Sequence, residues 1–350
     1  MPVAFADCEA GMRAYRFDSF ESLDALRLRE EADPRPQRGE VLVRVRAVSL
    51  NYRDIAILRG RYPRKAVPGL IPTSDAAGEI VAIGEGVRAF HIGDRVMGAF
   101  HPRWFGGEMP ATIQADTYGA ESDGWLCELK AVSQEAVVRV PETLSYEEAC
   151  TLPCAGLTAW TALSGPTPIR AGHKVLVQGS GGVSIFALQL ARAVGATVIA
   201  TTSSASKSEQ LEALGASAVI NYREDPDWGR SVRALTGGRG VDRVVEVGGP
   251  GTIGQSLRAV AVGGEIASIG FLSTDNPGID FFELKMSGAS FRNISVGDRA
   301  ALMELSRAVA ASGLKPMVDR VFDFDEAREA FSYLEAGEHL GKVVIRCGSK

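Results

Sequence analysis

The 350-residue sequence predicts an α/β protein in which a β-rich domain is followed by a doubly wound parallel sheet. Two patterns support this fold class. Residues 12–50 alternate apolar and polar side chains, as strands with one buried face do. Residues 174–200 read instead as a strand, a glycine turn, a helix and a second strand, which is the βαβ unit of a parallel sheet. We therefore expect two domains of different construction.

The front part of the chain predicts a compact, strongly bent β-domain. Strand patterns at residues 12–16 and 40–48 flank a Pro- and Gly-containing turn, and two more follow at 78–84 and 93–98 with glycines at short spacing. Residues 101–128 are polar and irregular but hold several aromatic side chains. Long loops inside compact domains are usually functional, so we expect this one to cover a pocket.

The rest of the chain predicts helices alternating with short buried strands. A helical pattern begins near residue 145 and continues to 163. Beyond the βαβ unit we expect strands at 242–248 and 265–270 and helices at 208–214 and 252–260, which complete the parallel sheet. After residue 291 the pattern leaves that sheet. It predicts helices at 299–312 and 325–335 and a final strand at 342–346.

Composition limits the classes of partner. A net charge of −5 gives no basic footprint for nucleic acid. No apolar run approaches the roughly 20 residues of a membrane span. The five cysteines are scattered and odd in number, so we expect reduced thiols in the cytoplasm. The partner that we expect is a small-molecule substrate, with neither nucleic acid nor membrane.

A glycine turn follows the strand at residues 174–178. Gly179 allows a tight turn, and Gly181 and Gly182 leave room for a pyrophosphate beside the start of the next helix. The unpaired N–H groups of that helix would face the anion. Ser184 stands in place of the third glycine and is still small enough for close helix–strand packing. With strands on both sides, the pattern predicts a dinucleotide site.

The end of the next strand indicates which dinucleotide binds. NAD sites usually carry an acid there, about 20 residues after the glycines, for the ribose hydroxyls. Here Ser203, Ser204 and Lys207 supply hydroxyls and a cation, and the first acid is Glu209. A carboxylate would repel an added 2′-phosphate by roughly 4 kcal/mol per charge pair at about 4 Å and an effective dielectric of about 20. The sequence favours NADPH, although these serines also suit a helix cap.

The order of these parts resembles the medium-chain dehydrogenase/reductase superfamily over nearly the whole chain. In detail it resembles the zinc-independent, quinone-oxidoreductase-like branch, often labelled NADP-dependent alcohol dehydrogenase. The resemblance implies a GroES-like catalytic domain from residues 1–153 and 295–350, a Rossmann domain from 154–294, and a homodimer paired edge to edge through the cofactor sheets. The segments that match besides the glycine turn are Gly93–Val96, Gly156–Trp160, Asp242–Gly249 and Gly341–Val344.

The resemblance allows a residue-by-residue test for zinc. Zinc-dependent members carry Cys-His, then Gly-His-Glu, then a further Cys, and here these positions hold Asn51-Tyr52, Thr73-Ser74-Asp75 and Cys154. Zinc needs three good N, S or O ligands, which this set does not provide. A structural zinc lobe would need four cysteines near residues 100–130, where only Cys127 occurs. We expect no bound metal, with Cys154 as a small buried side chain.

Three residues of the front domain are candidates for the chemistry. The turn that begins at Asn51 resembles the family turn beside the nicotinamide, so Asn51 would contact the cofactor and offer an amide N–H to a substrate carbonyl oxygen. Tyr52 is the best nearby proton donor by residue type, and Tyr62 matches a family tyrosine at the pocket mouth. The alternative is a turn or helix cap for Asn51 and Asp54, and simple packing for the two tyrosines.

The resemblance also assigns cofactor contacts. Thr158 would lie beside the nicotinamide ribose or phosphate, and the Gly181-Gly182-Val183 turn would hold the pyrophosphate. Tyr222 would join Ser203 and Lys207 at the 2′-phosphate, although an edge-strand aromatic is the alternative. Residues at strand ends or in the segment past the carboxamide complete the predicted site: Val247, Gly248, Ile269, Gly270, Phe271, Val296 and Gly297.

Three functions fit these predictions. The first is an NADPH-dependent oxidoreductase that transfers hydride to a polarised C=O or C=C bond in a quinone, an enone, an enoyl thioester or an aldehyde. The second is an NADP-dependent dehydrogenase for alcohol–carbonyl pairs. The third is an NADPH-binding protein without significant turnover, a role known among members of this family. The combination of Asn51, Tyr52 and the aromatic-bearing loop argues for an enzyme.

Overall fold

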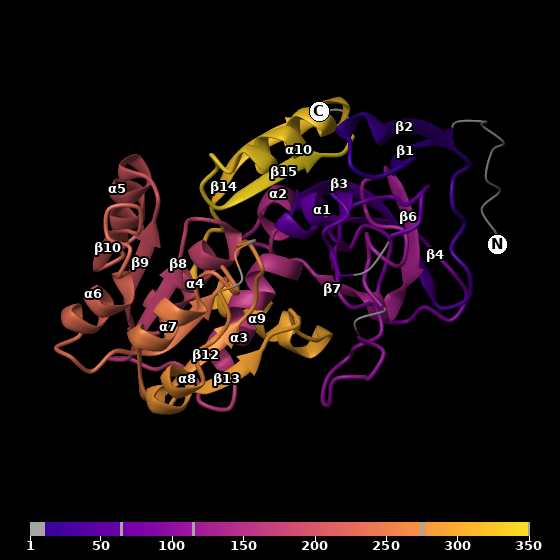
Figure 1. The fold of residues 1–350 in the computed structure, drawn as a ribbon. Coiled ribbons are helices and arrows are strands. Elements are labelled where there is room, and N and C mark those ends of the chain that lie inside the picture. The colour runs from indigo at the N-terminus through magenta and orange to yellow at the C-terminus, as the bar shows by residue number, and fades with distance from the viewer. Residues whose placement is uncertain (1–10, 64–65, 114–115, 274, 276, 349–350) are drawn as a thin grey trace. The chain divides into compact units, whose positions relative to one another are not determined.

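The computed structural model describes residues 11–63, 66–113, 116–273, 275 and 277–348. The chain forms two compact units. The first consists of residues up to Pro153 together with Arg320–Gly337 and the residues from Val343 onward. The second consists of Cys154–Asp319 and Glu338–Lys342. Each unit has its own sheet and core, and each is described by itself below (Figure 1).

The second unit contains the predicted doubly wound sheet. Its described strands are all parallel and lie in the order β10-β9-β8-β11-β12-β13. From β8 the chain moves outward through β9 to β10 and then returns to β11 on the other side of β8. Ligands of such sheets lie at the carboxyl ends of the strands where this reversal occurs. The strands are β8 (Lys174–Gln178), β9 (Thr197–Thr202), β10 (Ala218–Asn221), β11 (Val241–Glu246), β12 (Val260–Ser268) and β13 (Ser290–Asn293).

Helices accompany this sheet: α4 to α8 connect successive strands, α3 precedes β8 and α9 follows β13. On one face, α6 and α7 contact each other, and Trp228, Val232 and Leu257 pack on apolar strand residues such as Leu176 and Val244. In a second group, α3 contacts both α4 and α9. The apolar faces of these helices match the prediction of a parallel sheet covered by helices. The helices are α3 (Leu157–Ser164), α4 (Gly182–Ala193), α5 (Ala205–Ala213), α6 (Trp228–Leu235), α7 (Ile253–Ala259), α8 (Phe281–Ser287) and α9 (Arg299–Ser312).

A buried ion triad joins three neighbouring strands of this sheet. Glu265 on β12 lies 3.1 Å from the Arg243 guanidinium on β11 and 2.8 Å from that of Arg292 on β13. The two arginines also donate hydrogen bonds to the Ala162 carbonyl at the end of α3. Cations stabilise a helix carboxyl terminus, so the triad fixes α3 against the sheet.

The first unit is β-rich, as predicted. Its main sheet follows the order β14-β15-β3-β4-β5-β7, with β6 paired to β3, and β1 and β2 form a separate antiparallel pair. Phe17, Leu50, Ile80 and Trp125 lie in its core. The strands are β1 (Met12–Phe17), β2 (Leu26–Glu31), β3 (Glu40–Leu50), β4 (Asp75–Ile83), β5 (Arg95–Gly98), β6 (Leu129–Ser133), β7 (Val137–Arg139), β14 (Val318–Asp323) and β15 (Lys342–Arg346), and the helices are α1 (Tyr52–Leu58), α2 (Tyr146–Ala149) and α10 (Ala327–Ala336).

Three expectations need correction. Residues 295–319 belong to the second unit rather than the first, because Leu302, Leu305 and Val309 bury one face of α9, which contacts α3. The single helical run expected over 145–163 is divided by the π-helical turn Leu152–Gly156. Only part of the 101–128 loop can be a pocket cover, since Tyr118 and Trp125 are core residues in edge-to-face contact.

Candidate functional site

The glycine turn between β8 and α4 forms as predicted. Each of its three glycines meets a different structural requirement. Gly179 has φ +72°, in the left-handed region that side chains disfavour. A Cβ on Gly182 would lie 2.5 Å from Lys342 Cδ. A Cβ on Gly181 would meet nothing within 4 Å. The space beside Gly181, at the N-cap of a 12-residue helix, is therefore open, as a pyrophosphate at this position would require.

A short return segment, residues 338–342, packs on this turn. Gly341 N donates to the Ser180 carbonyl at 2.9 Å, and the buried Lys342 side chain lies over Gly182. Lys207 Nζ donates to the His339 carbonyl at 3.1 Å. Burial lowers the pKa of His339 to about 4, and the positive charges of Lys207 and Lys342 act in the same direction. No role was predicted for the side chains of Lys342 and His339, although the Gly341-Lys342 motif marked the segment.

The predicted 2′-phosphate residues lie around the carboxyl ends of the paired strands β9 and β10. Tyr222 N donates to the Thr202 carbonyl at 2.9 Å, which holds the two strand ends together. Ser204 is the N-cap residue of α5, and its hydroxyl lies 2.9 Å from that of Ser206. Lys207 stands in the first turn of α5, and burial lowers its pKa. Hydroxyls and a cation are thus carried by the N-cap and first turn of α5, and Tyr222, 41% exposed, follows the neighbouring strand β10.

The remaining cofactor residues of the second unit occupy two turns and the segment between β13 and α9. Val247 and Gly248 follow β11, while Ile269, Gly270 and Phe271 follow β12. A Cβ on Gly270 would lie only 2.1 Å from the Val247 carbonyl oxygen, so the two turns are in close contact. The structure brings these five residues together at the carboxyl edge of the sheet.

The segment at Val296 is strained. Val296 has φ +60°, which is unfavourable for a β-branched residue, and such outliers persist where the surroundings require them. A Cβ on Gly297 would lie within about 3 Å of Leu157 and Thr161 on α3, the helix that also carries the buried Thr158. The close packing of this segment on α3 accounts for the strained backbone.

In the first unit, Asn51 is tied into a buried polar cluster. It is the N-cap residue of α1, and its backbone N–H donates to Asp54 Oδ2 at 2.8 Å, so the cap interpretation is confirmed. Its amide Nδ2 donates to Asp75 Oδ2 at 3.1 Å, and Ser74 donates to the other oxygen of that carboxylate at 2.8 Å. Asn51 is 8% exposed and Asp75 is fully buried. Because a carboxylate only accepts, Asp75 fixes which end of the Asn51 amide faces it.

The two tyrosines differ in their surroundings. Tyr52 begins α1 and is 37% exposed. Tyr62 lies under the Arg53 guanidinium, whose Cζ is 5.2 Å from the centre of its ring. Arg53 is buried, stacks on Phe100 as well, and donates to the Tyr118 carbonyl at 2.8 Å. Arg53 thereby orders Tyr62, a contact that sequence spacing alone does not indicate.

The described residues contain no group of three or more His, Cys, Asp or Glu side chains arranged to hold a metal ion. Of the three positions that correspond to zinc ligands, Asn51 and Ser74 both donate hydrogen bonds to Asp75. Cys127, Cys150, Cys154 and Cys347 form no disulfide with one another, while Cys8 lies outside the described residues. Cys154, expected to be buried, is half-buried.

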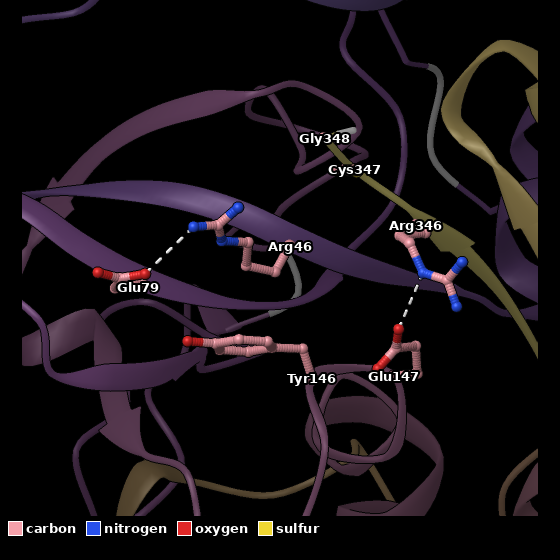
Figure 2. Close-up of a pocket in the computed structure, with 7 residues that line it drawn as sticks. All are labelled: Arg46, Glu79, Tyr146, Glu147, Arg346, Cys347 and Gly348. Atoms are coloured by element: carbon pink, nitrogen blue, oxygen red, sulfur yellow. Dashed lines mark hydrogen bonds and ion pairs between the residues drawn. The ribbon is translucent and has the colours of Figure 1, made fainter. Parts of the chain in front are cut away.

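A separate cavity of about 250 Å³ lies in the first unit between β3, β4, α2 and the end of β15 (Figure 2). Its charged side chains form ion pairs within the cavity wall, Arg46 with Glu79 at 3.3 Å and Arg346 with Glu147 at 3.0 Å. Its lining thus presents two neutral pairs rather than an excess of either charge. None of the predicted site residues lines it.

Comparison with known proteins identifies the family. A family model for the alcohol dehydrogenase GroES-like domain matches residues 37–142, and one for zinc-binding dehydrogenases matches residues 182–311. The chain belongs to the medium-chain dehydrogenase/reductase superfamily, as the sequence motifs indicated. In the described part of the chain, no helix combines the length and the apolar character needed to cross a membrane.

Individual relatives carry oxidoreductase names. The chain is 38% identical to a zinc-type alcohol dehydrogenase-like protein of Schizosaccharomyces pombe, covering 94% of this chain and 97% of that protein. It is 30% identical to the acryloyl-coenzyme A reductase of Metallosphaera sedula, covering 91% and 95%. A solved structure of a Sinorhizobium meliloti 1021 protein assigned to the alcohol dehydrogenases is similar with a TM-score of 0.90 at 40% identity, covering 97% and 99% of the chains. These relatives support an oxidoreductase with a nicotinamide cofactor.

Proposed function

We propose that this protein is an NADPH-dependent oxidoreductase that transfers hydride to a polarised C=O or C=C bond of a small substrate. The observation that carries the proposal is the open position beside Gly181, at the start of α4 and at the reversal point of the sheet. The candidate substrates are a quinone, an enone, an enoyl thioester or an aldehyde. The acryloyl-coenzyme A reductase of Metallosphaera sedula and the 2-methylene-furan-3-one reductase of Solanum lycopersicum, both 30% identical to the chain, favour this group.

The preference for NADPH rests on the residues around the ends of β9 and β10. Ser203, Ser204, Lys207 and Tyr222 would surround an added 2′-phosphate, and the Lys207 cation is held in place by the His339 carbonyl. Relatives alone do not select the cofactor, because similar solved structures include an NAD-dependent alcohol dehydrogenase and a mycobacterial protein complexed with NADPH. Titration with NADPH and NADH compares the two directly, and equal affinities would contradict the 2′-phosphate assignment.

A bound nicotinamide cofactor supplies the hydride, and the protein's residues orient the reactants and stabilise charge. Gly181, Gly182 and Val183 would bind the pyrophosphate, and the turns at Val247 and Ile269 would bound the nicotinamide half. Asn51, oriented by Asp75, would fix the substrate oxygen, while Tyr52 or Tyr62 would provide the proton. Replacement of Asn51 by alanine should lower the catalytic rate and leave NADPH affinity unchanged.

The proposed reaction uses no metal. Hydride transfer without zinc depends on hydrogen bonds to the developing oxyanion, and the zinc-ligand positions Asn51 and Ser74 are committed to Asp75. Elemental analysis of the purified protein tests this point. One zinc ion per chain would overturn the metal-free reaction even though the cofactor site remained.

A second candidate reaction is the interconversion of alcohols and carbonyls with NADP. The several relatives that are named alcohol dehydrogenases favour it. The two reactions are distinguished by NADPH oxidation with quinones, enones and aldehydes, compared with NADP⁺ reduction by the corresponding alcohols. Tight NADPH binding without turnover on either panel would indicate a binding protein without catalysis.

The best single test of the cofactor site uses its neighbouring glycines. Gly181→Ala adds a methyl group where the protein leaves open space, so the melting temperature should stay unchanged while NADPH affinity falls about 100-fold or more through collision with the pyrophosphate. Gly182→Ala is the matched control, because its methyl group meets Lys342 and should lower stability as well. Unchanged NADPH affinity in Gly181→Ala would place the cofactor elsewhere.

We also propose a homodimer that forms through the edge of the parallel sheet. β13 is the last strand in the sheet order, and nearby apolar side chains are exposed on α8, including Phe281 at 65%, Phe282 at 71% and Met286 at 76%. An edge strand beside exposed aromatic residues is typical of a surface that a second copy covers. Phe282→Asp should give a monomer in sedimentation, whereas Leu235→Asp on α6 should not.

A further inference from the structure

The carboxylate of Glu246 organises the two turns that follow β11 and β12. Glu246 is the last residue of β11 and is fully buried. Its Oε1 accepts hydrogen bonds from Gly248 N at 2.9 Å, Gly249 N at 3.0 Å and Thr252 Oγ1 at 2.5 Å. Its main-chain carbonyl accepts from Ile269 N at 2.9 Å and Gly270 N at 3.2 Å. One residue therefore holds both turns through different groups.

Gln178, the last residue of β8, completes this arrangement. Its Nε2 donates to Glu246 Oε2 at 2.7 Å, and its Oε1 accepts from Val247 N at 3.3 Å and Gly248 N at 3.2 Å. Gln178 directly precedes the glycine turn, so the pair links that turn to the one after β11. Ser256 supplies a further hydroxyl donor to Glu246 Oε2.

Simple packing does not account for a carboxylate at this position. Burial of a charged group is unfavourable unless hydrogen bonds replace its water, and an apolar side chain would fill the same volume without that cost. If Glu246 were apolar, the Gly249 N–H would lose its acceptor, and the Gly248 N–H would keep only its longer hydrogen bond to Gln178 Oε1. The turn after β11 therefore requires the acid at position 246, because its N–H groups and the Thr252 hydroxyl all donate to that carboxylate.

We propose that Glu246, through its pairing with Gln178, is a positioning residue: it holds the turns after β11 and β12 in the conformation that would bind the nicotinamide-ribose half of the cofactor. This inference rests on the proposed function. It assigns Glu246 no contact with substrate or cofactor. Val247, Gly248, Ile269 and Gly270 would make the contacts, and Glu246 holds their backbone in place.

The test exchanges the side chains of Glu246 and Gln178, singly and together. The affinities of two ligands are compared by isothermal titration calorimetry. Glu246→Gln places an amide N–H opposite the Gln178 amide N–H, and Gln178→Glu places two carboxylates face to face at the 2.7 Å contact. The double variant restores one donor facing one acceptor. The ligands are NADPH and adenosine 2′,5′-bisphosphate, which lacks the nicotinamide half and occupies only the β9–β10 side.

Each single variant should weaken NADPH about ten-fold or more, since a hydrogen bond to a charged group is lost, while adenosine 2′,5′-bisphosphate binds within about two-fold of wild type. The double variant should return NADPH affinity to within about three-fold of wild type. Thr236→Val is the control. It removes the buried hydroxyl that accepts a hydrogen bond from Gly240 N at the amino end of β11, far along the strand from Glu246, and should change neither affinity.

Equal losses for both ligands, or no loss of NADPH affinity in Glu246→Gln, would overturn the inference. If Glu246→Gln does not fold, Thr252→Val removes one donor to Oε1 and should weaken NADPH about three-fold or more with the bisphosphate unchanged. A Thr252→Val protein that binds NADPH like wild type then contradicts it. Failure of the wild-type protein to bind either ligand would refute the proposed function itself.

Discussion

The predicted site residues of the two units differ in the kind of group that they use. In the second unit, the predicted contacts at the glycine turn and at the strand ends are mostly main-chain groups, held by close glycine packing and by buried Gln178 and Glu246. In the first unit, the candidates Asn51, Tyr52 and Tyr62 act through side chains, and their orientation depends on contacts that no motif contains.

This difference separates binding from chemistry. Main-chain groups at a strand end have positions set by the fold, so they suit a cofactor that stays the same whichever substrate is bound. Side chains can be exchanged without changing the strands, and therefore adjust one fold to different substrates. The comparison predicts that variants of the second unit change cofactor affinity or stability, whereas variants of the first unit change the rate.

The largest expected effect concerns the return segment on the second unit. Unfolding exposes His339, which then takes up a proton below about pH 6.5, while the folded protein leaves it neutral down to a pKa of about 4. The stability that depends on neutral His339 is fully present above about pH 6.5 and is lost as the pH falls from there to about 4. The free energy of unfolding should fall by up to about 3 kcal/mol in this range.

Urea titrations at several pH values measure this effect. His339→Gln should flatten the dependence of stability on pH between about 6.5 and 4. His91→Gln is the control, since the His91 side chain is 82% exposed. Parallel curves for wild type and His339→Gln would show that the imidazole is not held neutral against Lys207 and Lys342.

The next largest effect tests the side-chain arrangement of the first unit. Asp75→Asn keeps the volume but removes the charge that orients the Asn51 amide, so kcat should fall about 10- to 30-fold, in line with the loss of a hydrogen bond to a charged group. NADPH affinity should remain within about two-fold. Ser74→Ala removes the other donor to Asp75 and should lower kcat less than about three-fold. An unchanged kcat in Asp75→Asn would remove this positioning role.

Sequence reasoning reached the second unit more completely than the first. The glycine turn, the parallel strands and the strand-end residues were predictable, because the repeat of the βαβ unit determines where carboxyl ends meet. The packing of Lys342 on Gly182 was not predictable, since it joins positions 160 residues apart and depends on how the return segment crosses the turn. The stacking of Arg53 on Tyr62 depends likewise on the loop after α1.

Short edge elements were also beyond the sequence pattern. β13 has four residues, of which none is fully buried, and α8 exposes Phe281 and Phe282, so neither element shows the apolar periodicity of its class. The assignment of residues 295–319 failed for a related reason. The apolar face of α9 indicates burial but does not say against which unit.

A smaller effect tests the predicted 2′-phosphate site, where the second unit uses side chains rather than main-chain groups. Lys207→Met keeps the stem that packs near the return segment but removes the cation, so NADPH should bind about ten-fold more weakly and NADH nearly unchanged. The change in the ratio of the two affinities is the measurement. An equal loss for both cofactors would mean that Lys207 supports the return segment rather than a 2′-phosphate.

The smallest effect tests whether surface ion pairs stabilise the first unit. Arg59 at the end of α1 and Glu335 on α10 form a two-pronged pair at 2.7 and 2.6 Å, and Arg59 lowers the pKa of Glu335. Their side chains are about 30% exposed, so solvent screens them, and a double-mutant cycle with Arg59→Gln and Glu335→Gln should give a coupling of about 0.5–1 kcal/mol. The coupling should shrink at 1 M salt, because the screening length is then about 3 Å. A salt-independent coupling above about 2 kcal/mol would mean that this pair joins α1 to α10 as strongly as a buried contact, and that the helix carrying Tyr52 is fixed from its far end.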